Sequence, residues 1–479
     1  MDTQAEILQL EQFRRQVYHS FDRRADATMD LLDALSSNTG ARSVVELSLN
    51  PHFRREYSSV FDAIDNFFQA SSPEQAPAER RHKERGLMRI IAHRLPQPRA
   101  RSFWLFGTDA TSIPRRFAHT VPDRGFVYQP NSIGGNKPIT IGHQSSTLAF
   151  LPEKGDADPA WIVPLLARRI TTQETETQVG AEQIAALMGD ATLPFHKALC
   201  VHVADSRYSG PKFLSPVARY KNLVNITRLR SNRVLYGPAP PVPTGKRPRG
   251  RPRWYGERFA LSDPTTWREP DAVAQTSHTS RRGRTYAVHM EAWEPLLMRG
   301  KRGYPMQRCP FTLVRIRLLD SDGRPAFKRP LWLIVMGRRR HELSVLAVYQ
   351  AYIQRYDLEH FFRFGKQRLL LDKYQTSDVE HGENWWQLVQ LAYVQLWLAR
   401  SLAETMLRPW ERYLPQPKSG IASPSTAQRD FGRIIRQIGT PAAAPKPRGK
   451  SPGRAKGTRP EPRKRHPVVK KGKKVPKAA

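Results

Sequence analysis

Short apolar segments dominate the middle of the chain, and they constrain its fold more than any other feature. They span residues 103–107, 139–150, 161–170, 198–204 and 222–229. Several are apolar nearly throughout, which is typical of strands covered on both faces. A helical pattern at 181–188 precedes the fourth segment, and after further strand signals two long helical patterns follow, at 344–370 and 383–407. This succession predicts an α/β fold with a mixed sheet flanked by helices.

The flanking segments differ from this pattern. Residues 1–98 show helical periodicity and are expected to form a separate helical domain that binds DNA ends, or a plain packing bundle. The segment 237–330 starts with a Pro- and Arg-rich linker and continues as a β-rich insertion. Residues 446–479 hold 14 Lys and Arg against the single acid Glu461. We therefore expect residues 413–479 to be a disordered polycationic tail.

The charge of the chain indicates its partner. There are 78 Lys and Arg against 43 Asp and Glu, a formal net charge of +35. Clustered cations gain binding free energy when they neutralise phosphates and release counterions. A nucleic acid is therefore the expected partner, and an anionic membrane surface is the weaker alternative. Two cysteines, Cys200 and Cys309, are too few for a disulfide framework. We find no apolar run long enough to span a membrane and no secretory signal, and we expect a cytoplasmic protein.

Two aspartates follow apolar segments. Asp109 comes after 103–107, and Asp205 after 198–204. Ligand sites in open α/β sheets gather at the carboxyl ends of strands, so both acids are candidates for chemistry. The alternative for each is a turn-forming or helix-capping aspartate.

A third acid lies in the long helical pattern at 344–370. On a single helix, Tyr352, Arg355, Glu359 and Lys366 would share an arc of roughly 60°. This face presents a carboxylate bracketed by a phenol and two cations. A solvated charged stripe is the alternative, but apolar residues surround the face. Three converging carboxylates would suit Mg²⁺ or Mn²⁺, and two such ions about 3.5–4 Å apart can clamp a phosphodiester.

The spacing Tyr352-x2-Arg355-x3-Glu359-x6-Lys366 is identical to the Y-x2-R-x3-E-x6-K signature of the cut-and-paste insertion-sequence transposases with a DDE triad. Over residues 100–410 the chain resembles that family. The resemblance implies a ribonuclease H-like catalytic core in two parts, 99–236 and 331–412. It also implies that Asp109, Asp205 and Glu359 are catalytic metal ligands, holding two Mg²⁺ ions for which Mn²⁺ can substitute.

The same resemblance implies a function. The protein would bind the terminal repeats of its mobile element, cleave them and insert them into target DNA. It would do so as a homodimer in a synaptic complex, associated with the nucleoid of a prokaryotic cell. Tyr352, Arg355 and Lys366 would hold DNA phosphates. The chain has no complete nucleotide-binding loop, so no nucleotide cofactor is expected. The alternatives are a catalytically inactive or repurposed DNA-binding relative, and a general polyanion-binding protein that relies on its tail.

Two further features concern DNA contacts. Arg249-Gly-Arg251-Pro resembles the centre of an AT-hook, which predicts that Arg249 and Arg251 enter the minor groove. A basic proline-rich loop without sequence preference is the alternative. By resemblance, Trp254, Trp267 or Trp293 would receive a flipped base, but core packing is the favoured role for any one of them.

Overall fold

The structure, a computed structural model, describes every residue except 1–2, 69–71, 73, 130–137, 156, 241–252, 281–282, 407, 409, 411–412, 414–419, 448–452, 454, 460 and 471–479. The chain forms two compact units. Unit 1 contains residues 1–96, 110–176 and 357–479, and unit 2 contains residues 97–109 and 177–356. Among the described residues, none of the helices has both the length and the apolar character that a membrane crossing requires.

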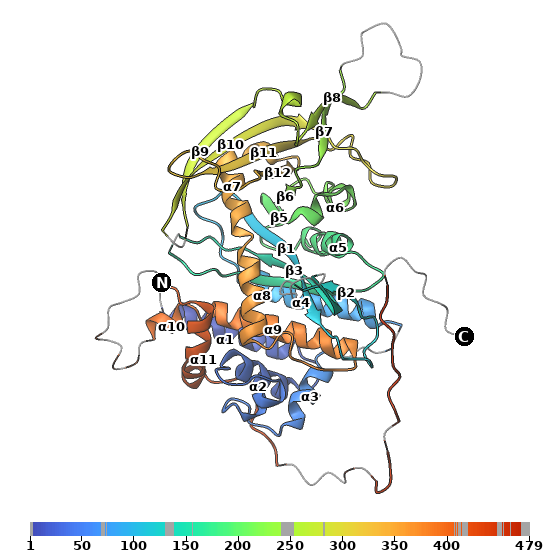
Figure 1. Cartoon of the computed structure of the whole chain (residues 1–479). Coiled ribbons are helices and arrows are strands. Elements are labelled where there is room, and N and C mark those ends of the chain that lie inside the picture. The colour runs from blue at the N-terminus through green and yellow to red at the C-terminus, as the bar shows by residue number, and fades with distance from the viewer. Residues whose placement is uncertain are drawn as a thin grey trace. The chain divides into compact units, whose positions relative to one another are not determined.

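Unit 2 is built on a large mixed sheet (Figure 1). Its strands follow the order β1 (Trp104–Pro114), β5 (Cys200–Ala204), β6 (Leu223–Leu229), β12 (Leu331–Met336), β11 (Phe311–Leu319), β10 (Thr285–Leu296) and β9 (Ala272–Thr279). The first three run parallel, and each later neighbour is antiparallel. All five residues of β5 are buried, as expected of a strand covered on both faces.

Helices flank this sheet. They are α5 (Glu176–Met188), α6 (Pro211–Val217) and α7 (Val345–Gln354), and α7 packs on β5, β6, β9 and β10. A separate two-stranded sheet joins β7 (Val234–Pro238) to β8 (Tyr255–Ala260). The predicted α/β class with a large mixed sheet is confirmed. The strands of the predicted insertion, β9, β10 and β11, extend the sheet of β6 and β12 directly.

Unit 1 holds the last residues of β1, from 110 onward, next to β3 (Ile139–Phe150). β3 is also antiparallel to β2 (Gly125–Tyr128) and β4 (Val163–Ile170). The helices of this unit are α1 (Thr3–His19), α2 (Ala25–Ser36), α3 (Ser58–Asp65), α4 (Ala76–Ala92), α8 (Asp357–Arg368), α9 (Val379–Leu398), α10 (Leu402–Thr405) and α11 (Pro424–Ile438). Every residue of α9 from 384 to 398 is buried, so this helix forms the centre of the unit.

The N-terminal helices do not form the separate domain that we predicted. α1, α2 and α3 all pack on α9, and α4 packs on β4, so residues 1–96 belong to unit 1. A buried ion pair contributes to this packing. Arg14 of α1 contacts Asp33 of α2 (2.5 Å) and Gln395 of α9 (2.7 Å). The apolar stripes of the N-terminal helices are therefore buried against the rest of unit 1 rather than against one another alone.

The predicted disordered tail is wrong for residues 424–438. They form α11, which packs on α2, α8, α9 and α10. Phe431 and Ile434 are fully buried, and Ser423 caps the helix by accepting from the N–H of Thr426. The basic composition of the segment conceals an amphipathic helix whose apolar residues recur at helical spacing.

Candidate active site

Asp109 and Asp205 lie side by side in unit 2. β1 and β5 are parallel, and their register pairs Thr108 with Ala204, the residues immediately before the two acids. The backbone of Asp205 is extended (φ −75°, ψ −175°), so it continues the strand geometry. Neighbouring strands are about 4.8 Å apart, and residues in register point to the same face. The two aspartates therefore follow a pair of residues that are in register on neighbouring strands. β1 itself continues to Pro114, so Asp109 lies within the strand and not at its end as we predicted.

Each aspartate has a defined environment. The Asp205 side chain accepts from the N–H of Arg207 (2.8 Å) and caps a short 3₁₀ helix, Ser206–Ser209. Asp109 Oδ2 lies 3.2 Å from Nη1 of Arg355, whose side chain is only 9% exposed. The Arg355 guanidinium also lies 5.0 Å from the ring centre of Tyr356. The cation compensates the charge of Asp109, which lowers the repulsion between the two neighbouring carboxylates.

A buried histidine fixes the strands that carry these acids. His202 of β5 is within hydrogen-bond distance of Thr108 Oγ1 on β1 (2.9 Å) and Asn225 Oδ1 on β6 (3.1 Å). Burial lowers the pKa of His202 to about 4, so the imidazole is neutral at neutral pH. His202 is thus a structural histidine with both ring nitrogens satisfied. It ties the three parallel strands together beside the candidate site.

The four-residue helix face is not present as we predicted it. The segment 344–370 forms two helices, because α7 ends at Gln354 and α8 begins at Asp357. At the junction the N–H groups of Arg355 and Tyr356 bond three residues back, to Tyr352 and Ile353, which tightens the turn. Tyr352 and Arg355 belong to unit 2, whereas Glu359 and Lys366 belong to unit 1. The four residues are therefore not all on one helix, and the rotation of 100° per residue that we assumed does not hold across the junction.

Helix α8, which carries Glu359, is held at both ends within unit 1. Lys154 Nζ contacts both carboxylate oxygens of Asp357, at 2.7 Å each. Lys366 Nζ donates to Thr111 Oγ1 (2.8 Å) and the carbonyl of Ser112 (2.9 Å) in the last part of β1. Burial lowers the pKa of Lys366. Lys366 thus fixes α8 against the strand that also carries Asp109, two residues before Thr111.

The structure places the other predicted DNA-contacting residues as follows. Tyr352 is buried, 2% exposed, and burial raises its pKa. Arg249 and Arg251 lie outside the described residues. Trp293 is buried, and its Nε1 donates to the carbonyl of Arg268 (2.8 Å). Trp267 packs between Phe259, Trp293 and Trp332, while Trp254 is half-buried. Trp267 and Trp293 are therefore part of an aromatic packing cluster.

The acid pair has the right chemistry for a divalent cation. Within the described part of the chain, no group of three or more His, Cys, Asp or Glu side chains is arranged to hold a metal ion. Mg²⁺, however, usually binds proteins through one or two carboxylates and completes its shell with water and substrate phosphates. Two adjacent carboxylates on rigid strands provide these hard oxygen ligands. The residues present therefore fit Mg²⁺ or Mn²⁺.

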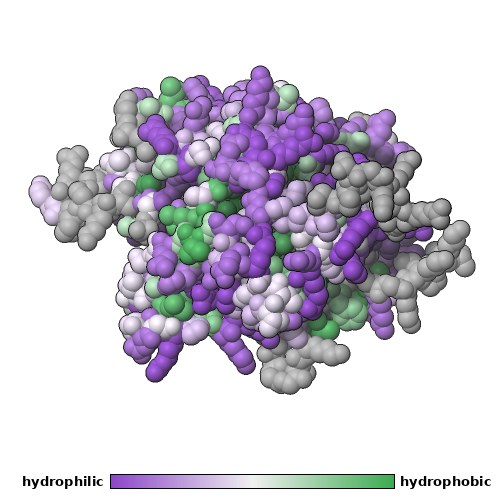
Figure 2. Space-filling model, turned by 90° about the horizontal axis from the view of Figure 1, so that it is seen from above, coloured by the Kyte–Doolittle hydropathy of each residue, from purple (hydrophilic) through white to green (hydrophobic). Residues whose placement is uncertain are grey.

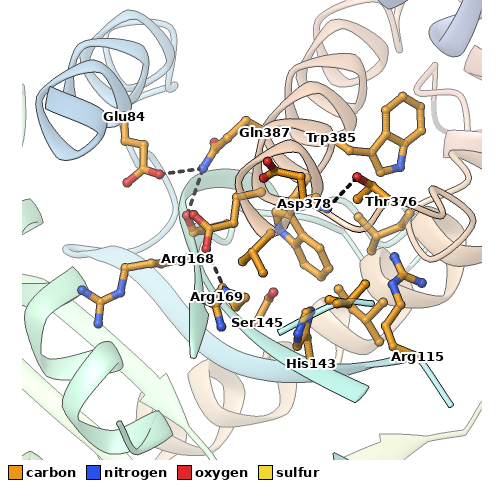
Figure 3. Close-up of a pocket in the computed structure, with 18 residues that line it drawn as sticks. Glu84, Arg115, His143, Ser145, Arg168, Arg169, Thr376, Asp378, Trp385 and Gln387 are labelled. Atoms are coloured by element: carbon orange, nitrogen blue, oxygen red, sulfur yellow. Dashed lines mark hydrogen bonds and ion pairs between the residues drawn. The ribbon is translucent and has the colours of Figure 1, made fainter. Parts of the chain in front are cut away.

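A separate pocket lies within unit 1, among α4, β3, β4 and the first part of α9 (Figure 3). Its lining, as far as the chain is described, includes none of the predicted site residues. Glu84 projects into it from α4, and the Gln387 amide donates to Glu84 Oε1 (3.3 Å). Burial raises the pKa of Glu84 from 4.5 to about 7. Glu84 was not predicted from the sequence. It lies in a basic helical segment, and no neighbouring residue indicates that this acid is buried.

Glu84 is expected to make stability fall as pH rises. The folded state holds the Glu84 proton more tightly than the unfolded state, so its contribution is complete below about pH 4.5 and is lost as pH rises through about 7. The shift corresponds to about 3 kcal/mol in the free energy of unfolding. Glu84→Gln should remove this part of the pH dependence, measured by chemical denaturation at acidic and alkaline pH. Identical pH dependence in the two proteins would exclude Glu84 as its source.

Comparison with known families identifies the family of the chain. Residues 16–294, more than half of the chain, match the family described as DDE superfamily endonuclease. The chain belongs to this family. The match includes Asp109 and Asp205 and ends before Glu359. No curated protein matches the sequence. The protein is therefore a nuclease-type enzyme whose family implies DNA as the substrate, and endonucleases of this superfamily typically use divalent metals.

The surface is consistent with such a substrate. The face of the molecule shown in Figure 2 is mostly hydrophilic, and its apolar side chains occur in small separated groups. The chain carries a formal net charge of +35. A hydrophilic surface on a chain of this net charge suits a polyanion, and the electrostatic attraction between them weakens as the salt concentration rises.

Proposed function

We propose that this protein is a DNA transposase that binds the ends of its mobile element, cleaves them and inserts them into target DNA. The observation that carries the proposal is the pair Asp109 and Asp205, which directly follow the paired residues Thr108 and Ala204 of two adjacent parallel strands in a DDE superfamily endonuclease. A rigid pair of carboxylates at this position is suited to phosphodiester chemistry. The four-residue signature around Glu359 narrows the class from nuclease to cut-and-paste transposase.

The strand order supports a ribonuclease H-like core. In unit 1, β4 pairs with β3, and β3 lies next to the last part of β1. In unit 2, the first part of β1 pairs with β5 and β5 with β6. The strand order β4-β3-β1-β5-β6 thus has an antiparallel pair, β3 and β4, on one side of β1 and two strands parallel to β1 on the other; Asp109 lies in β1 and Asp205 directly follows β5. We propose residues 99–236 and 331–412 as the two parts of this core.

The proposed chemistry assigns three carboxylates to the reaction. Asp109, Asp205 and Glu359 would hold the divalent ions, which when bound neutralise charge on the scissile phosphate and polarise its oxygens. A water oxygen attacks the phosphorus at the junction of element and flank, the phosphorus–oxygen bond breaks, and a free 3′ hydroxyl is left. In the joining step this hydroxyl attacks a target phosphodiester. One such bond forms for each that breaks, so the joining step requires no nucleotide cofactor.

The chain's own cations position the DNA in this proposal. Arg355, beside Asp109, offers planar donors that match a phosphate, and DNA binding would give it a second anionic partner. Lys366 fixes α8, and with it Glu359, against β1. The proposal retains phosphate contacts for Tyr352, Arg355 and Lys366 once DNA is bound, and minor-groove contacts for Arg249 and Arg251. It also includes a homodimer that synapses two ends, in the cytoplasm and associated with the nucleoid.

One experiment tests the function. The purified full-length protein is incubated with a labelled duplex that contains the inverted repeat flanking its coding region, with Mg²⁺ or with a chelator. The proposal predicts a cut at the junction of repeat and flank only with Mg²⁺, and none in a duplex with a scrambled repeat. Binding without any metal-dependent cut would instead identify a catalytically inactive DNA-binding relative.

A further inference from the structure

Part of the basic tail is docked on unit 1. The N–H of His466 donates to the carbonyl of His119 (2.8 Å), and the N–H of Val469 donates to the carbonyl of Arg124 (2.7 Å). Val469 also forms a parallel β-bridge with Gly125, the first residue of β2. The tail therefore runs beside the start of β2 and pairs with it at an isolated bridge, a minimal form of pairing with a sheet edge. This docking was not predicted for a polycationic tail.

A buried arginine anchors the docked segment. Arg124 is 1% exposed, and its guanidinium donates to the carbonyls of Val121 (3.3 Å), Arg115 (3.2 Å) and Arg116 (3.2 Å). Its Nη2 donates to the carbonyl of His466 (3.0 Å). The tail thus supplies one of the carbonyls that satisfy a buried cation. An unsatisfied buried donor is unfavourable, so the arrangement favours the docked tail.

The docked segment turns its charges outward. His466, Val468 and Val469 are half-buried against the protein. The tail cations Arg463, Lys464, Arg465 and Lys470 are all exposed. Within the described residues, none of these four side chains forms an ion pair. The docking therefore uses backbone hydrogen bonds, the Arg124 guanidinium and the half-buried side chains of the segment, and it leaves these four cations exposed.

The adjacent loop adds to this charge. Arg116 is exposed and stacks over the exposed ring of Phe117, 5.4 Å from its centre. We call Arg116, Arg463, Lys464, Arg465 and Lys470 together the tail ridge. Segment 463–470 in extended form covers roughly 23 Å, a length over which duplex DNA presents many phosphates. Docking this segment on a protein of charge +35 brings like charges together, which a polyanion would relieve.

We propose that the tail ridge is an ordered binding surface for the phosphate backbone of duplex DNA, formed only when the tail is docked beside β2. The inference rests on the proposed function for the choice of duplex DNA as the polyanion. It differs from the expectation of a flexible tail, because position as well as charge determines the contact. Docking fixes the cations before DNA arrives, which lowers the ordering entropy lost on binding.

Proline substitutions test the docking without changing any charge. His466→Pro/Val469→Pro removes both N–H donors, whereas His466→Ala/Val469→Ala removes the same side chains and keeps the donors. In the full-length protein, hydrogen exchange at positions 466 and 469 should be slow for the alanine pair. We expect the proline pair to bind a duplex of random sequence about 10-fold more weakly than the alanine pair at 0.1 M salt. Equal affinity of the two pairs would overturn the proposal.

A charge series tests the contact itself. Replacing Arg463, Lys464, Arg465 and Lys470 by glutamine should reduce the slope of log affinity against log salt by about 3–4. The matched control replaces Lys471, Lys473, Lys474 and Lys477 by glutamine and should change the slope less. Equal changes in the two variants would mean that only the total charge of the tail matters. A larger loss of affinity for single-stranded RNA than for duplex DNA would assign the tail ridge to RNA. Either result contradicts the proposal. The assay measures binding, so a wild-type protein that cuts no DNA would refute the proposed function and leave this inference intact.

Discussion

Asp205→Asn is expected to lower the rate of DNA-end cleavage by about 10³-fold or more while leaving the fold intact. Asparagine keeps an oxygen that can accept from the N–H of Arg207, so the cap of the following 3₁₀ helix is retained. What is lost is the negative charge beside Asp109, and with it a hard anionic ligand. Cleavage of the labelled end duplex in Mg²⁺ measures the effect, and thermal unfolding confirms that the protein remains folded.

Asp263→Asn is the matched control for this change. Asp263 also caps a 3₁₀ helix, by accepting from the N–H of Thr265, but it is a half-buried residue of the insertion whose side chain is 40% exposed. Its substitution should leave cleavage within a few-fold of the wild type. Asp109→Asn should match Asp205→Asn, and the double variant should be scarcely worse than either, because ligands of one site act as a unit. Cleavage near the wild-type rate in Asp205→Asn would remove the acid pair from the reaction.

Glu359→Gln is expected to have an effect of the same size, about 10³-fold on cleavage, although Glu359 lies beyond the family match. The side chain is exposed on α8, so the substitution should not disturb packing. The reason for the loss is the proposed role of this carboxylate as the third ligand. DNA binding in the presence of a chelator should stay within a few-fold of the wild type, which separates the chemical step from binding.

Glu380→Gln provides the comparison for this variant. Glu380 is an exposed carboxylate in the first turn of α9, so it shares the charge and the helical setting of Glu359. Its substitution should leave cleavage unchanged. If both variants cleaved at the wild-type rate, Glu359 would be an ordinary surface acid and the signature around it would carry no catalytic meaning.

The strands and the acid pair were predictable from the sequence because local signals carry them. Apolar runs followed by Asp109 and Asp205 indicate buried strands with acids beyond them, and parallel pairing of β1 with β5 then brings the acids together. The extent of β1 was not predictable in the same way. Residues 109–112 of β1 are half-buried and mostly polar, and they continue the strand because β3 lies next to the last part of β1 in unit 1.

The helix break at Arg355 and Tyr356 has no local signal. The segment contains no proline, and its only glycine, Gly365, lies inside α8. The break coincides with the boundary between units 1 and 2, so packing rather than helix propensity sets it. For this reason periodicity alone wrongly predicted one continuous face.

Helix α11, by contrast, had a signal that composition obscured. Ser423 and Pro424 are a helix start, apolar residues recur at helical spacing, and Gly439 follows the last turn. Averaging the whole of 413–479 as one basic segment conceals these features. The docking of His466 and Val469 has no comparable signature, because backbone N–H groups make its hydrogen bonds and every residue except proline carries one.

The most direct test of the account asks whether residues 109, 205 and 359 surround the same ions. Fe²⁺ is substituted for Mg²⁺ in the DNA-bound protein, and ascorbate with peroxide then generates radicals that cut the polypeptide next to the bound metal. We expect cuts close to all three positions, suppressed by excess Mg²⁺ and absent from the Asp109→Asn/Asp205→Asn protein. Cuts near positions 109 and 205 without one near 359, or cuts that excess Mg²⁺ leaves unchanged, would contradict it.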